Sequence, residues 1–318
     1  MPAAINELAA QCLFLAGPTA SGKSALALAL AEQLGGEIIS ADSMQVYRGL
    51  DLGTAKPTPA ERARVPHHLV DICELTEAFD AASFVRLAQT AAQAILARRR
   101  VPILCGGTGL YLKAFLKGLD ETPPSDPALR DELSARPLAE LLAELQARDP
   151  VAYTHIDRQN PRRVIRALEV IRLTGHPFSA QRADWSAGST ASNTPASARR
   201  FFCLRRDTDD LRRRINHRVD EMFRCGLVEE TRALLAAGLD RNPVAMQAIG
   251  YRQVVEYLRG ERTLPETIEQ VKARTRQFAK RQLTWFRLQT QATWLPIGPE
   301  ETVATSLRKL LAQTDYGS

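Results

Sequence analysis

An eight-residue stretch near the start of the chain, GPTASGKS at residues 17–24, constrains the fold more than any other feature of the sequence. It fits the pattern G-x-x-x-x-G-K-[ST], which binds phosphate when a strand precedes it and a helix follows it. The apolar run CLFLA (12–16) predicts that strand, and SALALALAEQL (24–34) has helix-forming composition. Because the motif and both of its neighbours agree, we predict a phosphate-binding loop.

The residue types in this loop suit a polyphosphate. Its glycines let backbone N–H groups point at phosphate oxygens, and the N-terminus of the next helix adds partial positive charge. Lys23 supplies a full charge, and a serine at the position of Ser24 is a magnesium ligand in such loops. We therefore expect Mg²⁺ as a cofactor on Ser24. The expected phosphate ligands are Gly17, Pro18, Thr19, Ala20, Ser21, Gly22, Lys23 and Ser24.

Beyond the loop, the first part of the chain continues to alternate between strand and helix. EIISAD (37–42) and VPILC (101–105) predict buried strands, and FVRLAQTAAQAILARRR (84–100) predicts a helix between them. Strands that alternate with helices in this way form parallel sheets. The predicted fold class is α/β, a P-loop NTPase-like parallel sheet flanked by helices.

A change of composition after the third strand marks a second unit. The junction DETPPSDP (120–127) is rich in proline and aspartate, and helix-forming segments follow it. The small polar residues of 186–200 predict a loop, and FFCLRR (201–206) predicts a strand that returns to the sheet. We expect a catalytic core formed by 1–119 and 201–318, with a helical insertion domain at 120–200.

The charge pattern indicates an anionic partner. The chain has 318 residues and a formal net charge of +6, and basic residues cluster in RRVIR (162–166), RRRINHR (212–218) and KARTRQFAKRQ (272–282). Such clusters are typical of proteins that bind polyanions. No apolar run is long enough to cross a membrane, no signal-peptide pattern is present, and the five cysteines form no C-x-x-C pair. We expect a cytoplasmic protein with no membrane partner.

The ends of the predicted strands leave one question open. Phosphate-loop ATPases and GTPases place an acidic residue after a neighbouring apolar strand, where it holds the magnesium shell. VPILC is followed by GGTG, whereas EIISAD ends in Asp42. From the residues alone, Asp42 serves the metal, caps a helix or has another task.

Several further segments, taken with the phosphate loop, resemble one family. The segments are EIISADSMQVYRGLDLGTAKP (37–57), HHLVDI (67–72), GGTGLYLKA (106–114), RALEVIRLTG (166–175), GLVEE (226–230), QAIGYRQ (247–253) and TRQFAKRQLTWFR (275–287). With them, the chain is similar to bacterial tRNA dimethylallyltransferases, also called tRNA isopentenyltransferases, from about residue 12 to residue 290. The resemblance implies transfer of a dimethylallyl group from dimethylallyl diphosphate to the N6 amine of the adenosine 3′-adjacent to the anticodon in tRNA.

The resemblance also implies roles for individual residues. Asp42 is expected to accept the proton that the amine loses, because an aromatic amine is a poor nucleophile without a base. Thr19 is expected to contact the bridging oxygen of the leaving diphosphate, and Lys23 its charged end. Arg214 and Arg218 match the family's diphosphate clamp, since an arginine fork suits phosphate oxygens.

A base in a stacked anticodon loop must be flipped out before an enzyme can modify it. The resemblance therefore implies an anticodon stem-loop partner, and we expect the enzyme to be a monomer. The expected tRNA contacts are Asp42, Ser43, Met44, Gln45, Thr108, Arg130, Arg162, Arg163, Val164, Ile165, Arg166, Gln247, Ala248, Ile249, Gly250, Tyr251, Arg252 and Lys280.

The basic segment near the C-terminus has a helical pattern of its own. Lys272, Arg276 and Lys280 recur every four residues, which predicts a stripe of three cations on one helix face. Val271, Phe278 and Trp285 recur every seven residues and predict an apolar face. Together these patterns predict an RNA-contacting helix, and the alternative is an amphipathic surface helix without a ligand.

Three other functions remain to be distinguished from transfer to tRNA. A prenyltransferase acting on free adenine nucleotides would share the first half of the chain, but the basic insertion and basic helix argue against it. A phosphate-loop kinase would transfer the γ-phosphate of ATP. An RNA-binding regulator would retain the fold without the reaction, but Thr19, Lys23, Ser24 and Asp42 are all present.

Overall fold

The computed structural model describes residues 7–119, 123–181 and 200–314 of the chain. Two compact units are present. Unit 1 comprises residues 1–118 and 194–318, and unit 2 comprises residues 119–193. The helical insertion predicted at 120–200 overlaps unit 2, while most of the loop predicted at 186–200 lies outside the described residues.

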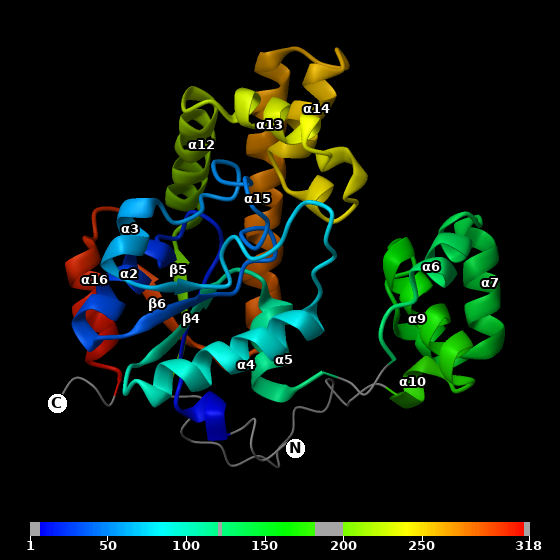
Figure 1. Cartoon of the computed structure of the whole chain (residues 1–318), viewed down its shortest axis with the longest axis horizontal. Coiled ribbons are helices and arrows are strands. Elements are labelled where there is room, and N and C mark those ends of the chain that lie inside the picture. Colours follow the sequence, from blue (N-terminus) through cyan, green and yellow to red (C-terminus); the bar gives the residue numbers. More distant parts are fainter. Residues whose placement is uncertain (1–6, 120–122, 182–199, 315–318) are drawn as a thin grey trace. The chain divides into compact units, whose positions relative to one another are not determined.

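A six-stranded sheet lies at the centre of unit 1 (Figure 1). Its strand order is β3-β2-β4-β1-β5-β6, and every neighbouring pair is parallel. The strands are β1 (Leu13–Ala16), β2 (Glu37–Ser40), β3 (His67–His68), β4 (Pro102–Gly106), β5 (Phe201–Arg206) and β6 (Thr293–Ile297). This sheet, flanked by helices, confirms the predicted fold class.

Two strands, β3 and β6, were not predicted. Two residues are too few for β3 to show a pattern, and β6 contains Pro296, which argues against a central strand. The structure places β6 at the edge of the sheet, where proline is tolerated because one side of the strand makes no ladder hydrogen bonds.

Alternate residues of the central strands face two different helical layers, as the period of a strand requires. Leu13 and Leu15 of β1 pack in one cluster with α2 (Lys23–Leu34) and α16 (Val303–Leu311). Phe14 and Ala16 pack in the other cluster with α4 (Ala81–Ala97) and α5 (Gly109–Lys117). The sheet is therefore the middle layer of three.

Figure 1 shows further helices of unit 1 beside and beyond the sheet. They are α3 (Pro59–Arg64), α12 (Thr208–Arg224), α13 (Leu227–Ala236), α14 (Tyr251–Leu258) and α15 (Leu264–Gln289), with the short 3-10 helices η1 (Leu239–Arg241) and η2 (Ala245–Gln247). The longest, α15, packs beside α12 and against α5. A segment near the C-terminus thus lies next to elements from the first half of the chain.

One helix begins earlier than predicted. The expected helix at 84–100 is α4, which spans Ala81–Ala97. It begins there because Asp80 caps it, with Oδ1 accepting a hydrogen bond of 2.8 Å from the N–H of Ser83. Such a cap satisfies a backbone donor that the helix itself leaves without a partner.

Unit 2 is a bundle of short helices with its own core. They are α6 (Pro127–Ser134), α7 (Leu138–Arg148), α8 (Pro150–His155), α9 (Pro161–Thr174) and α10 (Phe178–Gln181). Leu133, Leu145, Val164 and Leu168 are all fully buried between them. A separate apolar core supports the prediction that this insertion is a folded unit.

The sequence predicted no membrane-spanning segment and no paired cysteines. Across the described residues, no helix combines the length and the apolar composition that a membrane crossing requires. All five cysteines are free thiols, and four of them are buried.

Candidate functional site

Three loops that follow neighbouring strands meet at one edge of the sheet. The phosphate loop follows β1, the loop of Asp42 follows β2, and the loop of Thr108 follows β4. Because β2, β4 and β1 are adjacent and parallel, their carboxyl ends lie together, as in other open α/β sheets that bind ligands there. In the ladder Ala16 pairs with Gly106 and Ser40 pairs with Cys105, so the three loops begin at nearly the same level.

The phosphate loop leads directly into α2. Gly22 caps that helix with φ at 96°, a left-handed conformation that glycine adopts without strain. Lys23 is the first helical residue, and its Nζ lies 3.4 Å from the carbonyl oxygen of Pro18, over the loop itself. Burial lowers the pKa of this ammonium group, because water no longer solvates its charge. An anionic ligand such as a phosphate would stabilise the charged form.

Two arginines donate hydrogen bonds to backbone carbonyl oxygens of the phosphate loop. Arg214 Nε donates to Ala20 O over 3.0 Å, and Arg206 Nε donates to Ser21 O over 2.8 Å. Arg206 is buried and is also paired with Asp210 at 2.9 Å. It was not predicted, although it ends the strand FFCLRR. Ser21 is fully buried, and its hydroxyl has no hydrogen-bond partner among the described residues.

Asp42 lies just beyond the end of β2 and uses its two carboxylate oxygens differently. Oδ1 accepts from the N–H of Met44 at 2.9 Å and from the N–H of Gln45 at 3.4 Å, which fixes the side chain on its own turn. No donor in the described part of the chain forms a hydrogen bond with Oδ2. One oxygen is therefore structural, and the other is available to a ligand.

Arg218 of α12 faces this carboxylate. Its Nη2 donates to the carbonyl oxygen of Thr54 over 3.5 Å. Burial lowers the pKa of the guanidinium, and the negative charge of Asp42 opposes that effect. Lys23, Arg218 and Asp42 thus form a small group of two cations and one anion.

These groups surround one cavity of about 350 Å³ in unit 1. It is lined by twelve of the residues predicted from the sequence: Thr19, Lys23, Ser24, Asp42, Ser43, Met44, Gln45, Thr108, Arg218, Gln247, Ala248 and Ile249. The structure thereby brings three of the eight predicted phosphate ligands, Thr19, Lys23 and Ser24, and part of the predicted acceptor side into a single space. A charged end next to an apolar wall suits a ligand that has a polyanionic head and an uncharged remainder.

Helix α15 supplies a wall of this cavity that was largely unpredicted. Val271, Thr275, Phe278 and Gln282 line the cavity, and their spacing of three or four residues places them on one helix face. Val271 and Phe278 belong to the apolar face predicted from their seven-residue spacing, but that spacing did not indicate that they line the cavity. Their partner across the cavity is α12, through Val219 and Met222. Only the packing of α12 against α15 reveals that both faces are turned toward the phosphate loop.

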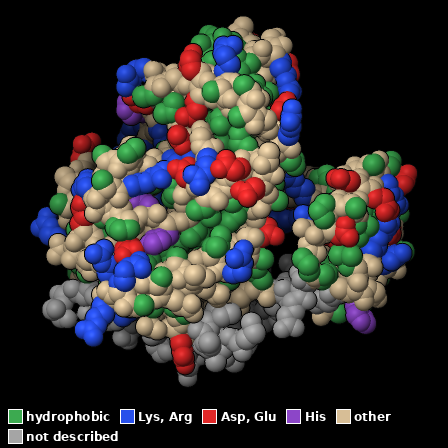
Figure 2. Space-filling view, viewed as in Figure 1, with side chains coloured by type: hydrophobic (Ala, Val, Ile, Leu, Met, Phe, Trp, Pro, Cys, Tyr) green, Lys and Arg blue, Asp and Glu red, His purple; other side chains and the backbone are tan. Residues whose placement is uncertain are grey.

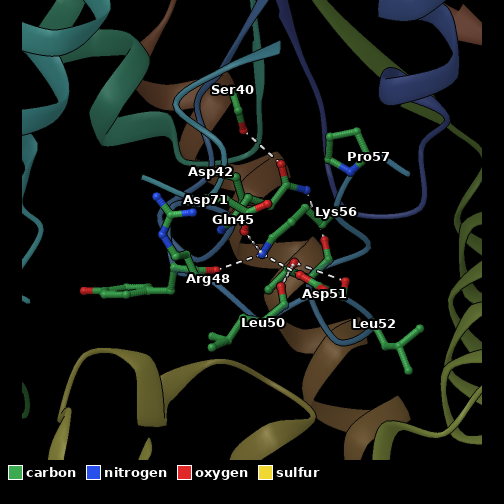
Figure 3. Close-up of polar contacts among 12 residues, drawn as sticks. Ser40, Asp42, Gln45, Arg48, Leu50, Asp51, Leu52, Lys56, Pro57 and Asp71 are labelled. Carbon is green, nitrogen blue, oxygen red and sulfur yellow. Dashed lines mark hydrogen bonds and ion pairs between the residues drawn. The ribbon is translucent and has the colours of Figure 1, made fainter. Parts of the chain in front are cut away.

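The segment 53–57 forms another wall of the cavity, and the side chain of Gln45 is hydrogen-bonded to its backbone (Figure 3). Gln45 Oε1 accepts from the Ser40 hydroxyl at 2.9 Å, and Nε2 donates to the carbonyl oxygens of Thr54 and Ala55, both at 3.2 Å. The amide of Gln45 therefore already has protein partners on both sides, whatever its predicted contact with tRNA.

Lys56, which belongs to the same segment, anchors it through its buried ammonium group (Figure 3). Its side chain is 2% exposed, and Nζ contacts Asp51 Oδ1 at 2.6 Å and Asp71 Oδ1 at 2.5 Å. Nζ also donates to the carbonyl oxygen of Tyr47 over 2.8 Å. All three ammonium protons thus have an acceptor, which is the condition for a buried lysine to remain charged.

We expect Lys56→Met to lower the free energy of unfolding by about 2–3 kcal/mol, because it leaves the carboxylate of Asp71 without one of its buried partners. Arg62 still pairs with Asp71, which limits the loss. Chemical denaturation measures the change, and the exposed Lys117→Met is the matched control. Equal stability of the two variants would contradict the anchoring role.

The segment QAIGYR contributes to the site only in part. Gln247, Ala248 and Ile249 line the cavity, whereas Gly250 is buried and does not line it. Tyr251 is fully buried, and its hydroxyl donates to Glu230 at 2.5 Å and accepts from the N–H of Gly53 at 3.0 Å. The expectation of an RNA contact was wrong for the Tyr251 side chain, because the sequence pattern cannot distinguish an inward tyrosine from an outward one.

The predicted stripe of cations on α15 is only partly available. Lys272 pairs with Asp220 at 2.7 Å, and Arg276 donates to Asn216 Oδ1 at 2.7 Å, so both side chains join α15 to α12. Lys280 is exposed beside a groove that contains Trp285. Arg252 is exposed and makes a helical ion pair with Glu256 at 3.3 Å. On the face of unit 1 that Figure 2 shows, basic side chains are likewise interspersed with acidic ones.

In unit 2, the predicted basic residues divide into two groups. Arg130 and Arg166 both pair with Glu169, whose side chain is fully buried in α9. Val164 is also fully buried, so its side chain offers no surface to RNA, and that expectation was wrong. Arg162 and Arg163 are exposed, and Ile165 is partly exposed. The helical period of α9 explains this division, because residues 164 and 168 face the core.

The cavity suits a magnesium ion that is held mainly by a bound phosphate. Among the described residues, no group of three or more His, Cys, Asp or Glu side chains is arranged so that it could hold a metal ion by itself. The cavity instead offers the hydroxyl of Ser24 and the free oxygen of Asp42. Mg²⁺ keeps several waters and commonly binds through one or two protein ligands and substrate phosphates. The residues present therefore fit this ion.

The chain is similar to several known proteins. A family model described as IPP transferase matches residues 45–289. A tRNA dimethylallyltransferase 1 from Trichlorobacter lovleyi is 48% identical over 287 residues, which cover 89% of this chain and 92% of that protein. A tRNA dimethylallyltransferase from Geobacillus kaustophilus is 47% identical over 292 residues, 90% of each chain.

Solved structures agree with these sequence matches. The full-length tRNA isopentenylpyrophosphate transferase of Bacillus halodurans has a TM-score of 0.68 and 38% identity, and the match covers 94% of both chains. A eukaryotic dimethylallyltransferase, whose structures describe it acting on tRNA, has a TM-score of 0.72 and 27% identity. That match covers 90% of this chain and 73% of the eukaryotic one.

Proposed function

The chain belongs to the IPP transferase family, whose matching members are tRNA dimethylallyltransferases, and we propose the details of its reaction as follows. It is a prenyltransferase that modifies tRNA. The donor is dimethylallyl diphosphate, and the acceptor is the N6 amine of the adenosine 3′-adjacent to the anticodon. The product is N6-dimethylallyladenosine, with diphosphate released.

One observation carries this proposal. A single cavity contains the phosphate loop, Arg218 and a carboxylate oxygen of Asp42 that has no hydrogen-bond donor among the described residues. A transferase that moves a prenyl group from diphosphate to an amine needs an anion site and a proton acceptor side by side. A cavity with both, and with the apolar wall of α15, supports that chemistry.

The proposed reaction is a substitution at carbon 1 of the donor. The lone pair of N6 forms the new C–N bond, and the C–O bond to diphosphate breaks with its electron pair on the leaving oxygen. The proton of the amine passes to Oδ2 of Asp42. Lys23, Arg218 and the N–H groups of the phosphate loop stabilise the negative charge that develops on the diphosphate. Thr19 is proposed to contact its bridging oxygen.

We also propose Mg²⁺ as the cofactor, held by Ser24 and the diphosphate. When bound, this ion supplies positive charge to the leaving group. Ser24 is the second residue of α2 and lines the cavity. Lys23 and Ser24 both line the cavity, so the ion and the ammonium group are proposed to act on the diphosphate while Asp42 takes the proton.

The tRNA is proposed to bind through its anticodon stem-loop, with the target adenine flipped into the cavity. Gln247, Ala248 and Ile249 line the cavity and are candidates for base contacts. In unit 2, the exposed Arg162 and Arg163 are candidates for phosphate contacts. We further propose that the enzyme works as a monomer in the cytoplasm.

The test is a modification assay with the purified protein. It contains Mg²⁺, dimethylallyl diphosphate and an anticodon stem-loop, and mass analysis after digestion looks for one added prenyl group on the adenosine 3′ of the anticodon. Parallel reactions contain AMP, ADP or ATP. Modification of the stem-loop alone supports the proposal. Modification of the free nucleotides alone contradicts it and identifies a nucleotide prenyltransferase.

We expect Arg163→Ala to weaken stem-loop binding without lowering the stability of unit 2, because this side chain is exposed. The slope of log affinity against log salt should become shallower by roughly 0.7–0.9 for one lost phosphate contact. Arg166→Ala is the comparison, since it removes a partner of the buried Glu169 and should lower the unfolding temperature. An unchanged slope of log affinity against log salt for Arg163→Ala would mean that Arg163 makes no contact with an RNA phosphate.

A further inference from the structure

Gln282 connects two of the three loops around the cavity. It is a buried residue of α15, and its Oε1 accepts a hydrogen bond of 2.9 Å from the N–H of Thr19 in the phosphate loop. Its Nε2 donates to the carbonyl oxygen of Gly107, also over 2.9 Å. The two contacts span 263 and 175 residues of sequence, so they are tertiary links and not local turns.

The second link continues to the loop of Asp42. Next to Gly107, the hydroxyl of Thr108 accepts from the N–H of Ser43 at 3.2 Å, and the N–H of Thr108 donates to Ala41 O over 3.2 Å. Through these contacts one side chain of α15 joins the loop that holds the phosphates to the loop that carries the proton acceptor.

The fit around Gln282 is close. A Cβ atom on Gly107 would lie 2.2 Å from Nε2, so only glycine allows the amide to approach at this position. A glutamine is also the side chain this place requires, because it offers an acceptor and a donor at the same time. Glutamate would keep the bond to Thr19 but would turn an oxygen toward Gly107 O. Methionine would make neither bond.

Gln282 lies on the face of α15 that lines the cavity. Thr275 and Phe278 precede it on the face that lines the cavity, and Arg281 is its direct neighbour. A helix that lines the acceptor space is therefore hydrogen-bonded to the phosphate loop. The distance between the bound diphosphate and the bound adenine would then depend on the hydrogen bonds of Gln282, although Gln282 itself would contact neither substrate.

We propose that Gln282 is a positioning residue that sets the distance between the diphosphate and the proton acceptor. This inference rests on the proposed function and deepens it. In the reaction above, the amine must approach carbon 1 while its proton approaches Asp42, and a displacement of about 1 Å from such a geometry costs on the order of 100-fold in rate. Gln282 fixes that geometry through the backbone of Thr19 and Gly107.

The experiment compares Gln282→Met and Gln282→Glu with the wild-type enzyme, and the exposed Gln33→Met is the matched control. Three quantities are measured: the single-turnover rate with the stem-loop, the affinity for inorganic diphosphate with Mg²⁺, and amide hydrogen exchange of the phosphate loop. For Gln282→Met we expect a rate lower by about 10- to 100-fold. Diphosphate affinity should change by less than about fivefold, and exchange at Thr19 should be about tenfold faster.

The variants separate positioning from folding. Gln282→Glu keeps the bond to Thr19, so its exchange there should stay near the wild-type value while its rate still falls. If Gln282→Met does not fold, the proposal is tested with Gln282→Glu alone. A wild-type single-turnover rate in Gln282→Glu then overturns the proposal. A rate loss that only mirrors a loss of diphosphate affinity overturns it as well.

The same experiment distinguishes this inference from the function on which it rests. If the wild-type protein modifies no stem-loop, the proposed function fails, and hydrogen exchange at Thr19 still tests the link. Unchanged exchange in Gln282→Met would then show that Gln282 does not hold the loop. If the wild-type protein is active and both variants match it, the function stands and the positioning role is wrong.

Discussion

Asp42→Asn should lose about 10²- to 10⁴-fold in the rate of prenyl transfer, which is the usual contribution of a positioned base. Asparagine keeps an oxygen that can accept from the N–H groups of Met44 and Gln45, so the turn after β2 is preserved. It cannot take up the proton of the amine. Single-turnover measurements with a stem-loop and saturating donor report the rate of the chemical step.

The same variant also tests the alternative role of Asp42 in the magnesium shell. If Asp42 is the base, Asp42→Asn should bind diphosphate and Mg²⁺ with nearly wild-type affinity. The exposed Asp240→Asn is the control for a lost carboxylate elsewhere in unit 1. Loss of diphosphate affinity in parallel with the rate would contradict the base role and assign Asp42 to the metal.

Lys23→Met should weaken the binding of diphosphate by roughly 100-fold and lower kcat/KM for the donor by a similar factor. The size follows from the loss of one preorganised cationic donor, which costs about 2.7–4 kcal/mol in comparable sites. Lys23 lies over the phosphate loop and lines the cavity, so no neighbouring lysine replaces it among the described lining residues. Calorimetric titration with diphosphate and Mg²⁺ measures the affinity.

Two further observations decide whether that loss is specific. The affinity for the stem-loop in the absence of donor should be unchanged, because Lys23 is expected to contact only the diphosphate. Lys117→Met, which removes an exposed lysine of α5, should bind diphosphate normally. Normal diphosphate affinity in Lys23→Met would mean that the phosphate loop is not used, and the proposed donor would have to bind elsewhere.

The phosphate loop and the sheet were predictable because their signals are local. A motif of eight residues, an apolar run before it and a helical run after it all belong to one continuous segment of the chain. The same holds for the strand that ends before Asp42. Its place beside the phosphate loop follows from a general rule for parallel sheets, without any knowledge of the other walls of the cavity.

Patterns that depend on the orientation of a helix were less reliable. On α15 the period of four predicted three cations on one face, but Lys272 and Arg276 turn toward α12. On α9 the basic run contains Val164, which the helix buries, and Arg166, which holds Glu169. In each case the period was right. What the sequence lacks is the partner element that decides which face is inside.

The α/β fold, the phosphate loop and the acidic residue at a neighbouring strand end were all predictable from the order of the residues. Those features depend on interactions between residues close together in the chain, or on strands whose order the fold class limits. The remaining walls of the cavity, the anchor at Lys56 and the bridge at Gln282 became visible only when the packed elements were seen together. Their contacts join residues up to 263 positions apart, and a buried amide or ammonium group reveals its role only through the partners that satisfy it.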